Sequence, residues 1–359
     1  MGNKPYLAFY QLKTKNLVIS LIYFLLLLLI YRTESILKIN THYLGTDQAD
    51  GGLYVWLFKS NLKDLWELPW FNTRAFYPYT LSLAWSDNFI LPAIVAKPFV
   101  LLGLPVIIVY NLCLLGATFL NGFCTFKIAY QLSHHFLGSL IAGTIFLGFP
   151  FFVLHLGHPQ LQFAFWIPLV FGLYCKFLHQ PKFTTAILLG FTLFLSFLTT
   201  VYYTIFIVVA LLLITLALIA YQTSFFSKKN IYPAILGLII GLAPIIPFAL
   251  PYLEVKDTYG TRDLISVSTF GASLIAYFSA PSSHLLIDFT AIWSKAEAQL
   301  FPGIVCLLSL LVVVMKLGRQ NPMPIIRELA MIFLMATCIQ IMGFAIAVWF
   351  YWLVFFGFL

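Results

Sequence analysis

The sequence contains little charge for its length. Only 9% of its 359 residues are Asp, Glu, Lys or Arg, whereas 62% are hydrophobic. A water-soluble chain of this size would form about two or three domains. A mean hydropathy of +0.96 and long apolar stretches exclude that organisation, because runs of about 17–25 apolar residues are typical of transmembrane helices. The sequence predicts an all-α fold, a polytopic membrane helix bundle that forms one membrane domain over residues 1–359.

Motifs for zinc, disulfides and nucleotides are also absent. The five cysteines lie inside apolar stretches, without CxxC spacing or a clustered histidine, so we interpret them as packing residues. The chain has no GxxxxGK[ST], no GxGxxG after a strand and no DxD, which argues against use of a nucleotide sugar on the cytoplasmic side. The net charge is +8, but no basic cluster is interleaved with aromatic residues, so nucleic acid is excluded as a partner.

Nine apolar stretches are predicted to cross the membrane: Leu17–Tyr31, Val106–Tyr130, Leu137–Val153, Phe163–Leu178, Thr184–Leu198, Tyr202–Tyr221, Tyr232–Tyr252, Phe301–Met315 and Leu329–Phe350. A tenth stretch, Phe89–Gly103, contains Pro92, Lys97 and Pro98, which the interior of a membrane helix tolerates poorly. We therefore interpret it as a re-entrant or interfacial helix.

The positions of basic residues support this topology. If Phe89–Gly103 does not fully cross, the basic residues between the later spans fall on the cytoplasmic side, as the positive-inside rule requires. Lysines also precede the first span, and Arg32-Thr33-Glu34 stands where a signal-peptide cleavage site would lie. The first span is thus predicted to be uncleaved, with a cytoplasmic N-terminus.

Three polar segments then share the outer, non-cytoplasmic face. They are a first outer loop of residues 32–88, the short turn Leu154–Gln162, and a second outer loop of residues 254–300. The first outer loop holds half of the chain's 12 acidic residues. Because so few charged residues are available for polar chemistry, the candidate site is predicted on this face. No soluble C-terminal domain is expected after the last span.

Asp47 and Asp50 lie at the start of the first outer loop, between glycines that allow close approach of the backbone. A partly desolvated carboxylate can act as a general base, and two together can bind a divalent cation such as Mg²⁺ or Mn²⁺. These two residues are therefore the candidate catalytic residues and, if a metal is used, the candidate ligands. A solvated turn is the simpler alternative, since Asp and Gly are typical of turns.

Aromatic residues gather in the same loop. Trp56, Tyr77 and Trp85, together with Asp87, are candidates for binding a sugar or an acceptor, because sugars bind against aromatic faces. Trp and Tyr also mark membrane interfaces in general, so anchoring at the interface is the alternative role.

The two other outer segments supply further candidates. His155 and His158 are three residues apart; they can bind a metal, but no third ligand is near in sequence, so hydrogen bonding at the interface is the favoured role. In the second outer loop, Arg262 and then Lys256 are candidates for binding a phosphate group, because arginine offers a bidentate fork. An ordinary solvated loop with surface ion pairs is the alternative.

The order of these motifs resembles the integral membrane glycosyltransferases of the C-type fold (GT-C) that use lipid-linked sugars, in particular a broad bacterial branch. The likeness covers about residues 17–316. Its motifs are Leu44-Gly45-Thr46-Asp47-Gln48-Ala49-Asp50 followed by Trp56, Phe76-Tyr77-Pro78, Leu83-Ala84-Trp85-Ser86-Asp87, His155-Leu156-Gly157-His158, Tyr277-Phe278-Ser279-Ala280-Pro281 and Glu297-Ala298-Gln299-Leu300-Phe301-Pro302-Gly303.

The resemblance implies transfer of a sugar from a polyprenyl-phosphate carrier to a lipid, glycan or protein acceptor, in contact with membrane lipids of the bacterial inner (plasma) membrane. The early acid would serve as the base, a role that falls on Asp50 or Asp47; the spacing to Trp56 favours Asp50. Glu297 joins the residues implied in sugar or acceptor binding. The acidic pair is spread over Asp-x-x-Asp, so dependence on a divalent cation stays open.

Two other functions remain open at this point. A non-enzymatic lipid or polysaccharide transporter or flippase would need polar residues inside its spans, and the mid-span candidates are few: Lys97, Asn121, Lys127 and Gln340. A truncated, inactive relative of the glycosyltransferases would keep the fold without the activity.

Overall fold

The computed structural model describes residues 4–31, 33–45, 50–149, 151–152, 155–179, 181–221, 228–260, 273–280, 287–295 and 299–301, together with residues 282, 304 and 308. Within these ranges the chain forms α- and 3-10 helices and no strand. The predicted all-α fold is confirmed for this part of the chain. The predicted spans Phe301–Met315 and Leu329–Phe350 lie almost entirely outside it.

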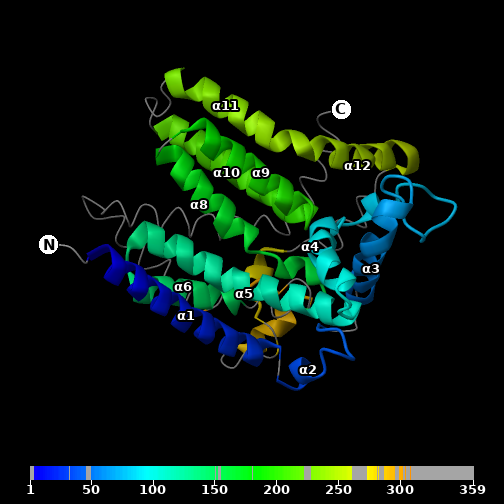
Figure 1. Ribbon diagram of the computed structural model, residues 1–359, viewed down its shortest axis with the longest axis horizontal. Coiled ribbons are helices and arrows are strands. Elements are labelled where there is room, and N and C mark those ends of the chain that lie inside the picture. Colours follow the sequence, from blue (N-terminus) through cyan, green and yellow to red (C-terminus); the bar gives the residue numbers. More distant parts are fainter. Residues whose placement is uncertain are drawn as a thin grey trace.

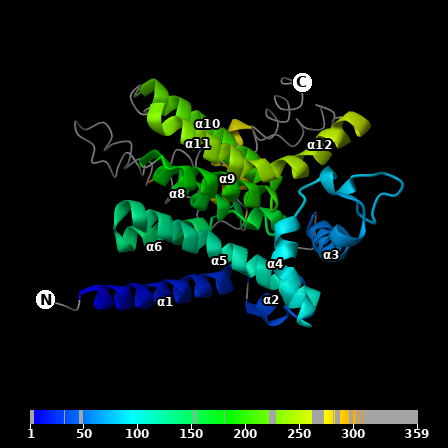
Figure 2. The same cartoon turned by 45° about the horizontal axis from the view of Figure 1, so that its top comes forward.

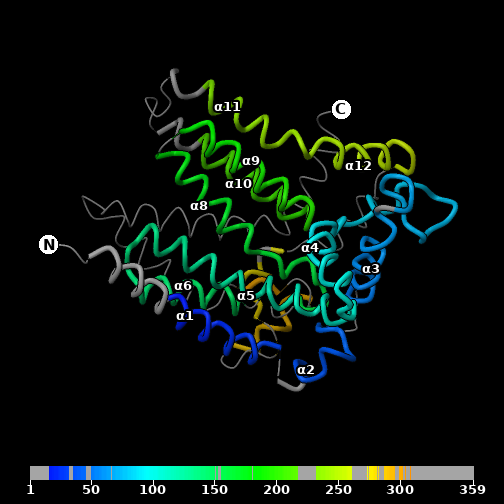
Figure 3. Tube along the Cα trace, in the orientation of Figure 1, coloured from blue at the N-terminus to red at the C-terminus, as the bar shows by residue number. Residues whose placement is uncertain are grey.

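The long helices lie in two groups along the longest axis of the molecule (Figures 1 and 2). The first group contains α1 (Lys4–Ile30), α5 (Val106–Ser133) and α6 (Phe136–Leu147). The second contains α8 (Trp166–His179), α9 (Phe183–Phe197), α10 (Val201–Tyr221) and α11 (Lys228–Leu242). A 3-10 turn, η3 (Ala243–Ile245), links α11 to α12 (Ile246–Tyr259), and Figure 3 shows the two helices following one another toward the end of the molecule that carries α3.

Two helices among the described residues are long and apolar enough to cross a membrane. They are Val106–Ser133, which is α5, and Tyr232–Tyr259, which combines α11, η3 and α12. The other apolar helices are shorter. Helix α12 continues to Tyr259, so residues 254–259 of the predicted second outer loop, Lys256 among them, are helical.

Glycines bring pairs of helices into backbone contact. A Cβ atom at Gly190 in α9 would lie 2.8 Å from the backbone carbon of Gly241 in α11, and a Cβ at Gly143 in α6 would lie 2.6 Å from the carbonyl oxygen of Gly122 in α5. Such contacts are typical of helices that pack without side chains between them, as in membrane bundles.

The first outer loop contains regular structure that the sequence analysis did not predict. It includes α2 (Thr33–Leu37), the 17-residue helix α3 (Gly51–Glu67) and the 3-10 turn η1 (Ser82–Trp85). In α3 the side chains of Tyr54, Leu57, Phe58 and Asn61 are buried, at the spacing of one helical face. The helix is held at the end of the bundle by this face.

The stretch Phe89–Gly103 forms α4 (Ile90–Leu101), a helix of 12 residues. Its length is about 18 Å, against about 30 Å for the hydrocarbon core of a bilayer. Helix α6, part of the predicted span Leu137–Val153, has the same number of residues, so the re-entrant or interfacial interpretation of Phe89–Gly103 stays a prediction. At the first turn of α4, the amide of Leu91 donates to the carbonyl of Leu198, 2.8 Å away.

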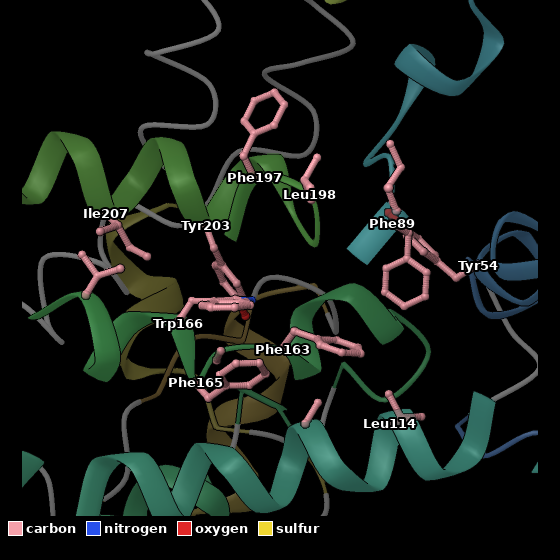
Figure 4. Close-up of a cluster of buried hydrophobic side chains, with 14 of the residues drawn as sticks. Tyr54, Phe89, Leu114, Phe163, Phe165, Trp166, Phe197, Leu198, Tyr203 and Ile207 are labelled. Carbon is pink, nitrogen blue, oxygen red and sulfur yellow. The ribbon is translucent and has the colours of Figure 1, made fainter. Parts of the chain in front are cut away.

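A row of aromatic side chains connects the outer helices to the bundle (Figure 4). The ring of Phe89 meets Tyr54 of α3 and Phe163, each edge to face with centroids 5.4 Å apart. Phe165 continues the row to Trp166 of α8, with centroids 4.6 Å apart. Edge-to-face aromatic pairs contribute beyond the area they bury, so this row fixes α3 relative to α8.

Candidate functional site

Asp50 and His158 form the centre of the candidate site. Asp50 is the N-cap residue of α3, and its Oδ2 atom lies 3.1 Å from Nδ1 of His158. The side chain of Asp50 is 46% exposed and that of His158 is 22% exposed. The contact is a hydrogen bond, and an ion pair when His158 is protonated. It holds the Asp50 carboxylate in place while leaving it accessible from outside the protein.

The turn that carries the two histidines is held by amide side chains from the bundle. Gln162 donates from Nε2 to the carbonyl oxygens of Phe152 (3.0 Å) and His155 (2.9 Å), and Asn121 of α5 donates to the carbonyl of Gln162 at 2.9 Å. His155 is buried, and its Nδ1 lies 2.7 Å from the carbonyl oxygen of Phe151. Because a buried amide that lost such a partner would be costly, this network fixes the position of His158.

The start of the first outer loop contacts the same turn. Gly45 has a φ of +114°, a conformation that favours glycine, and a Cβ there would lie only 2.7 Å from the carbonyl oxygen of Leu156. Asn111 of α5 is buried and binds three backbone groups ahead of Gly45: its Oδ1 accepts from the amide of Leu44, and its Nδ2 donates to the carbonyls of Ile39 and His42, all at 2.8 Å.

Tyr54 links Asp50 to the buried carboxylate of Asp87. It lies one helical turn after Asp50, and its hydroxyl is 3.4 Å from both Oδ2 of Asp87 and Oγ of Ser86. Burial raises the pKa of Tyr54 well above its usual range, and nearby negative charge raises that pKa further, more from Asp87 than from Asp50. Tyr54 is therefore neutral and donates from its hydroxyl to Asp87.

Asp87 binds the N-terminal end of α10. Its Oδ1 accepts from the backbone amide of Val201 at 2.7 Å, and its Oδ2 accepts from the hydroxyl of Thr200 at 3.3 Å. Burial raises the pKa of Asp87 to about 7, and the hydrogen bonds to the carboxylate only partly oppose that shift. The sequence predicts Asp87 as a sugar- or acceptor-binding residue; in the structure this carboxyl is buried and bound within the protein.

One face of α12 packs against the residues that flank Asp87. The Tyr252 hydroxyl donates to the carbonyl of Ser86 at 3.0 Å, and the Tyr259 hydroxyl accepts from the amide of Thr80 at 3.0 Å. Lys256 lies between these two tyrosines at helical spacing, so it belongs to the same face. The structure thus brings the predicted phosphate-binding Lys256 onto the same side as the segment that carries Trp85 and Asp87.

Trp85 is the centre of an aromatic cluster next to this face. Phe76 stacks on its ring with centroids 5.0 Å apart, while Tyr79 and Tyr259 approach at 5.7 and 5.5 Å. Tyr77, beside Phe76, is 92% exposed. The two predicted sugar-binding residues therefore differ: Trp85 is half-buried in the cluster, whereas Tyr77 projects into its surroundings.

The remaining predicted residues are placed as follows. Trp56 is half-buried on α3 and packs against the main core. Asp47, Arg262 and Glu297 lie outside the described residues, so their roles remain predictions. Across the ranges described, no group of three or more His, Cys, Asp or Glu side chains is arranged to hold a metal ion; a cation site that includes Asp47 falls outside this test.

Sequence reasoning missed the ion pairs that close the end of α3. Arg74 donates from Nε to Oδ1 of Asp64 at 2.6 Å and from a terminal nitrogen to Glu67 at 3.0 Å. Asp64 is buried and also accepts from the hydroxyl of Ser60 at 2.7 Å. The spacing of Ser60 and Asp64, four residues apart, is compatible with a helix here.

A family model described as a domain of unknown function (DUF6311) matches residues 20–354. The matched range includes Asp50, Asp87 and His158, so the candidate site lies inside the matched domain. No curated protein matches the chain.

Proposed function

We propose that this chain, which belongs to the DUF6311 family, is an integral, multi-pass membrane glycosyltransferase. It transfers a sugar from a polyprenyl-phosphate carrier to a lipid, glycan or protein acceptor on the outer face. The observation that carries the proposal is the half-exposed carboxylate of Asp50, held by His158 at the end of a bundle of apolar helices. A fixed, accessible carboxylate next to apolar surface suits a base that acts on a lipid-linked substrate.

The outward faces of the bundle support a location in the membrane. Large apolar side chains are exposed on several helices, among them Leu29 of α1, Leu112 of α5, Leu213 of α10 and Ile239 of α11. Apolar surface of this extent fits contact with lipid tails and would favour aggregation in water. In our proposal the helices cross repeatedly, the N-terminus is cytoplasmic, and the end that carries α3 is at the outer face of a bacterial inner membrane.

Asp50 is the proposed base. The acceptor hydroxyl gives its proton to the Asp50 carboxylate as its oxygen attacks the anomeric carbon of the sugar. The bond between that carbon and the phosphate oxygen breaks, and polyprenyl phosphate leaves with the bonding electrons. One displacement of this kind inverts the configuration at the anomeric carbon. His158 orients Asp50 and does not itself touch the reacting atoms.

Lys256 is the described residue that we assign to the leaving phosphate. It lies on the face of α12 that is anchored one turn earlier by Tyr252 and three residues later by Tyr259. A cation placed where negative charge develops stabilises the transition state. Arg262, three residues after Tyr259 in sequence, remains the other proposed phosphate ligand, and Trp85 with Tyr77 provides aromatic surface for the sugar.

If the reaction uses a divalent cation, we propose that Asp47 and Asp50 are its ligands. Mg²⁺ or Mn²⁺ would neutralise the phosphate if it bound there. The assay below compares reactions with and without added cation for this reason.

The alternative of a transporter gains no support from the polar residues inside α5. Asn111 and Asn121 are both buried, and both bind backbone groups of the segments that position the site. All polar atoms of the Asn111 side chain are paired in this way, whereas Asn121 uses its Nδ2 and its buried Oδ1 has no hydrogen-bond partner in the described part of the chain.

The test is a transfer assay in proteoliposomes. Wild-type protein, Asp50→Asn and Asp257→Asn are given radiolabelled undecaprenyl-phosphate sugars and a crude membrane acceptor fraction, with and without Mg²⁺. Asparagine is also a favourable N-cap residue, so Asp50→Asn is expected to fold, which its unfolding temperature verifies. Asp257 is exposed on α12 and serves as the matched control.

We expect label to move to acceptor with wild type and Asp257→Asn, and a loss on the order of a hundredfold or more with Asp50→Asn. Normal turnover by Asp50→Asn would reject Asp50 as the base. Label that crosses the membrane without reaching acceptor would instead indicate a transporter.

A further inference from the structure

Three described pieces of the chain after Gly260 form one small hydrogen-bonded cluster, which we call the η4–η5 cluster: residues 273–280, 287–295 and 299–301. It contains the 3-10 turns η4 (Leu274–Phe278) and η5 (Asp288–Trp293). The amides of Leu300 and Phe301 donate to the carbonyls of Ala276 (2.9 Å) and Ser279 (3.2 Å). These bonds join the last piece to the first.

Three polar side chains of the cluster point inward, whereas Ser273, Asp288 and Lys295 are exposed. Ser279, Thr290 and Gln299 are all buried. The Ser279 hydroxyl donates to the carbonyl of Thr290 at 2.8 Å, the Thr290 hydroxyl accepts from the amide of Ala280 at 2.9 Å, and Gln299 donates to the carbonyl of Ala291 at 3.0 Å. The side chains thus pair with backbone groups of the cluster itself, as polar groups must where water is excluded.

Five large apolar side chains of the cluster point outward, whereas Leu300 and Phe301 are buried. Ile275, Phe278, Phe289, Ile292 and Trp293 are all exposed, Ile292 to 87%. Phe289 and Trp293 contact each other edge to face, with centroids 6.1 Å apart. A loop that faces water is expected to show the opposite distribution, because exposed large apolar surface and buried polar side chains both oppose its stability in water.

The cluster also lies alongside the helices and not beyond their ends. In Figures 1 and 2 its yellow-orange trace is near the middle of the molecule's length, between the end that carries the N-terminus of α1 and the end that carries α3. The helices themselves expose apolar side chains such as Leu112 and Leu213. The charged residues Asp288 and Lys295 are placed on either side of the exposed Phe289, Ile292 and Trp293 in sequence.

We propose that the η4–η5 cluster is a lipid-facing element that inserts Phe289, Ile292 and Trp293 among the acyl chains of the bilayer. Residues 254–300 are predicted from the sequence to form an outer loop, with an ordinary solvated loop as one alternative, and the proposal replaces that interpretation for the η4–η5 cluster. We assign the bilayer as the partner of the apolar surface. In a hydrocarbon environment, stable structures pair their polar groups internally and expose apolar side chains. The inference does not depend on the proposed glycosyltransferase activity.

The test places an environment-sensitive fluorophore at Ile292. In a background with the five cysteines replaced by alanine, single-cysteine variants Ile292→Cys, Leu29→Cys and Lys63→Cys are labelled with a nitrobenzoxadiazole probe and reconstituted into phosphatidylcholine vesicles. Leu29 is exposed on apolar α1 and Lys63 is exposed on α3, so they provide the lipid and water references. Each variant is quenched separately by brominated lipid and by iodide.

We expect the probe at position 292 to follow the probe at position 29, with blue-shifted emission, strong quenching by brominated lipid and little by iodide. Emission and iodide quenching like those at position 63 would overturn the proposal. Protection from both quenchers, with disulfide cross-linking of Ile292→Cys between molecules, would also overturn it, because the surface would then be covered by a second copy of the chain. Size-exclusion profiles matching the cysteine-free parent establish that each variant is folded.

Discussion

The carboxylate of Asp50 and the imidazole of His158 lie 3.1 Å apart, although 108 positions separate them in sequence. Neither residue is held by its neighbours in sequence alone. Asp50 is fixed by the start of α3, whereas His158 follows a turn fixed by Gln162 and Asn121. Because the two residues are held by different segments, variants of either segment can test whether the contact between Asp50 and His158 matters for activity.

His158 is expected to act by orienting Asp50. His158→Gln should lower the maximal rate of transfer by up to about a hundredfold, with little change in the donor concentration that gives half-maximal rate, because the donor site is intact. Initial rates over a range of donor concentrations measure both quantities. His135→Asn is the matched control: His135 caps α6 by accepting from the amide of Gly138 at 2.9 Å, and asparagine keeps that cap. Equal losses in both variants would contradict a specific role for His158.

Gly45 is expected to tolerate no side chain. In Gly45→Ala the Cβ would approach the carbonyl oxygen of Leu156 to 2.7 Å at a φ of +114°, so we expect destabilisation of about 1–3 kcal/mol and reduced transfer. Gly52→Ala, in the first turn of α3, meets no atom within 4 Å and should be neutral or stabilising by up to about 1 kcal/mol. Thermal unfolding in detergent and the transfer assay check both variants. Identical behaviour of the two alanines would refute the contact.

The long apolar helices could be predicted from the sequence because their continuous apolar runs are longer than those found in loops. The predicted span Val106–Tyr130 begins at the residue where α5 begins and ends three residues before Ser133. Helix α3 was missed because lysines and acidic residues lie between its buried positions. The segment was interpreted by its composition and not by the helical spacing of its apolar residues. The extension of α12 to Tyr259 was also missed, because the last residues of this helix are charged and resemble a loop.

Individual residues of the candidate site could be predicted from the sequence, but the contacts between them could not. Asp50, His155 and His158 were each identified, but no local pattern specifies a contact between residues so far apart. The burial of Asp87 depends on where α10 begins, which is a property of packing and leaves no signature near Asp87 itself. The roles of Asp47, Arg262 and Glu297 remain predictions.

Asp87 is expected to make stability depend on pH. Burial raises its pKa from the usual 3.8 to about 7, so between these values the folded protein holds a proton that the unfolded chain releases. The contribution of the Asp87 proton to the free energy of unfolding is therefore complete at low pH. It decreases as pH rises toward about 7, by about 1.4 kcal/mol for each pH unit in which only the folded protein holds that proton. Unfolding temperatures of wild type and Asp87→Asn over this range isolate the effect, because other titrating groups are common to both proteins.

Asparagine at position 87 does not titrate and can still accept from the amide of Val201. We thus expect the unfolding temperature of wild type relative to Asp87→Asn to fall with rising pH. A relative temperature that rises with pH would mean that the folded protein prefers the ionised carboxylate, and that the hydrogen bonds from Val201, Thr200 and Tyr54 outweigh burial.

Asn111 is expected to hold the approach to Asp50. In Asn111→Leu the amide of Leu44 and the carbonyls of Ile39 and His42 lose their buried partner, each at a cost of about 1–3 kcal/mol if no water replaces it. The unfolding temperature should fall, and protease should cleave the chain between residues 39 and 45 more rapidly. Thr192→Val is the control, because the hydroxyl of Thr192 bonds only within α9, to the carbonyl of Leu188. If Asn111→Leu resisted protease as the control does, residues 39–45 would have to be held by contacts other than this amide.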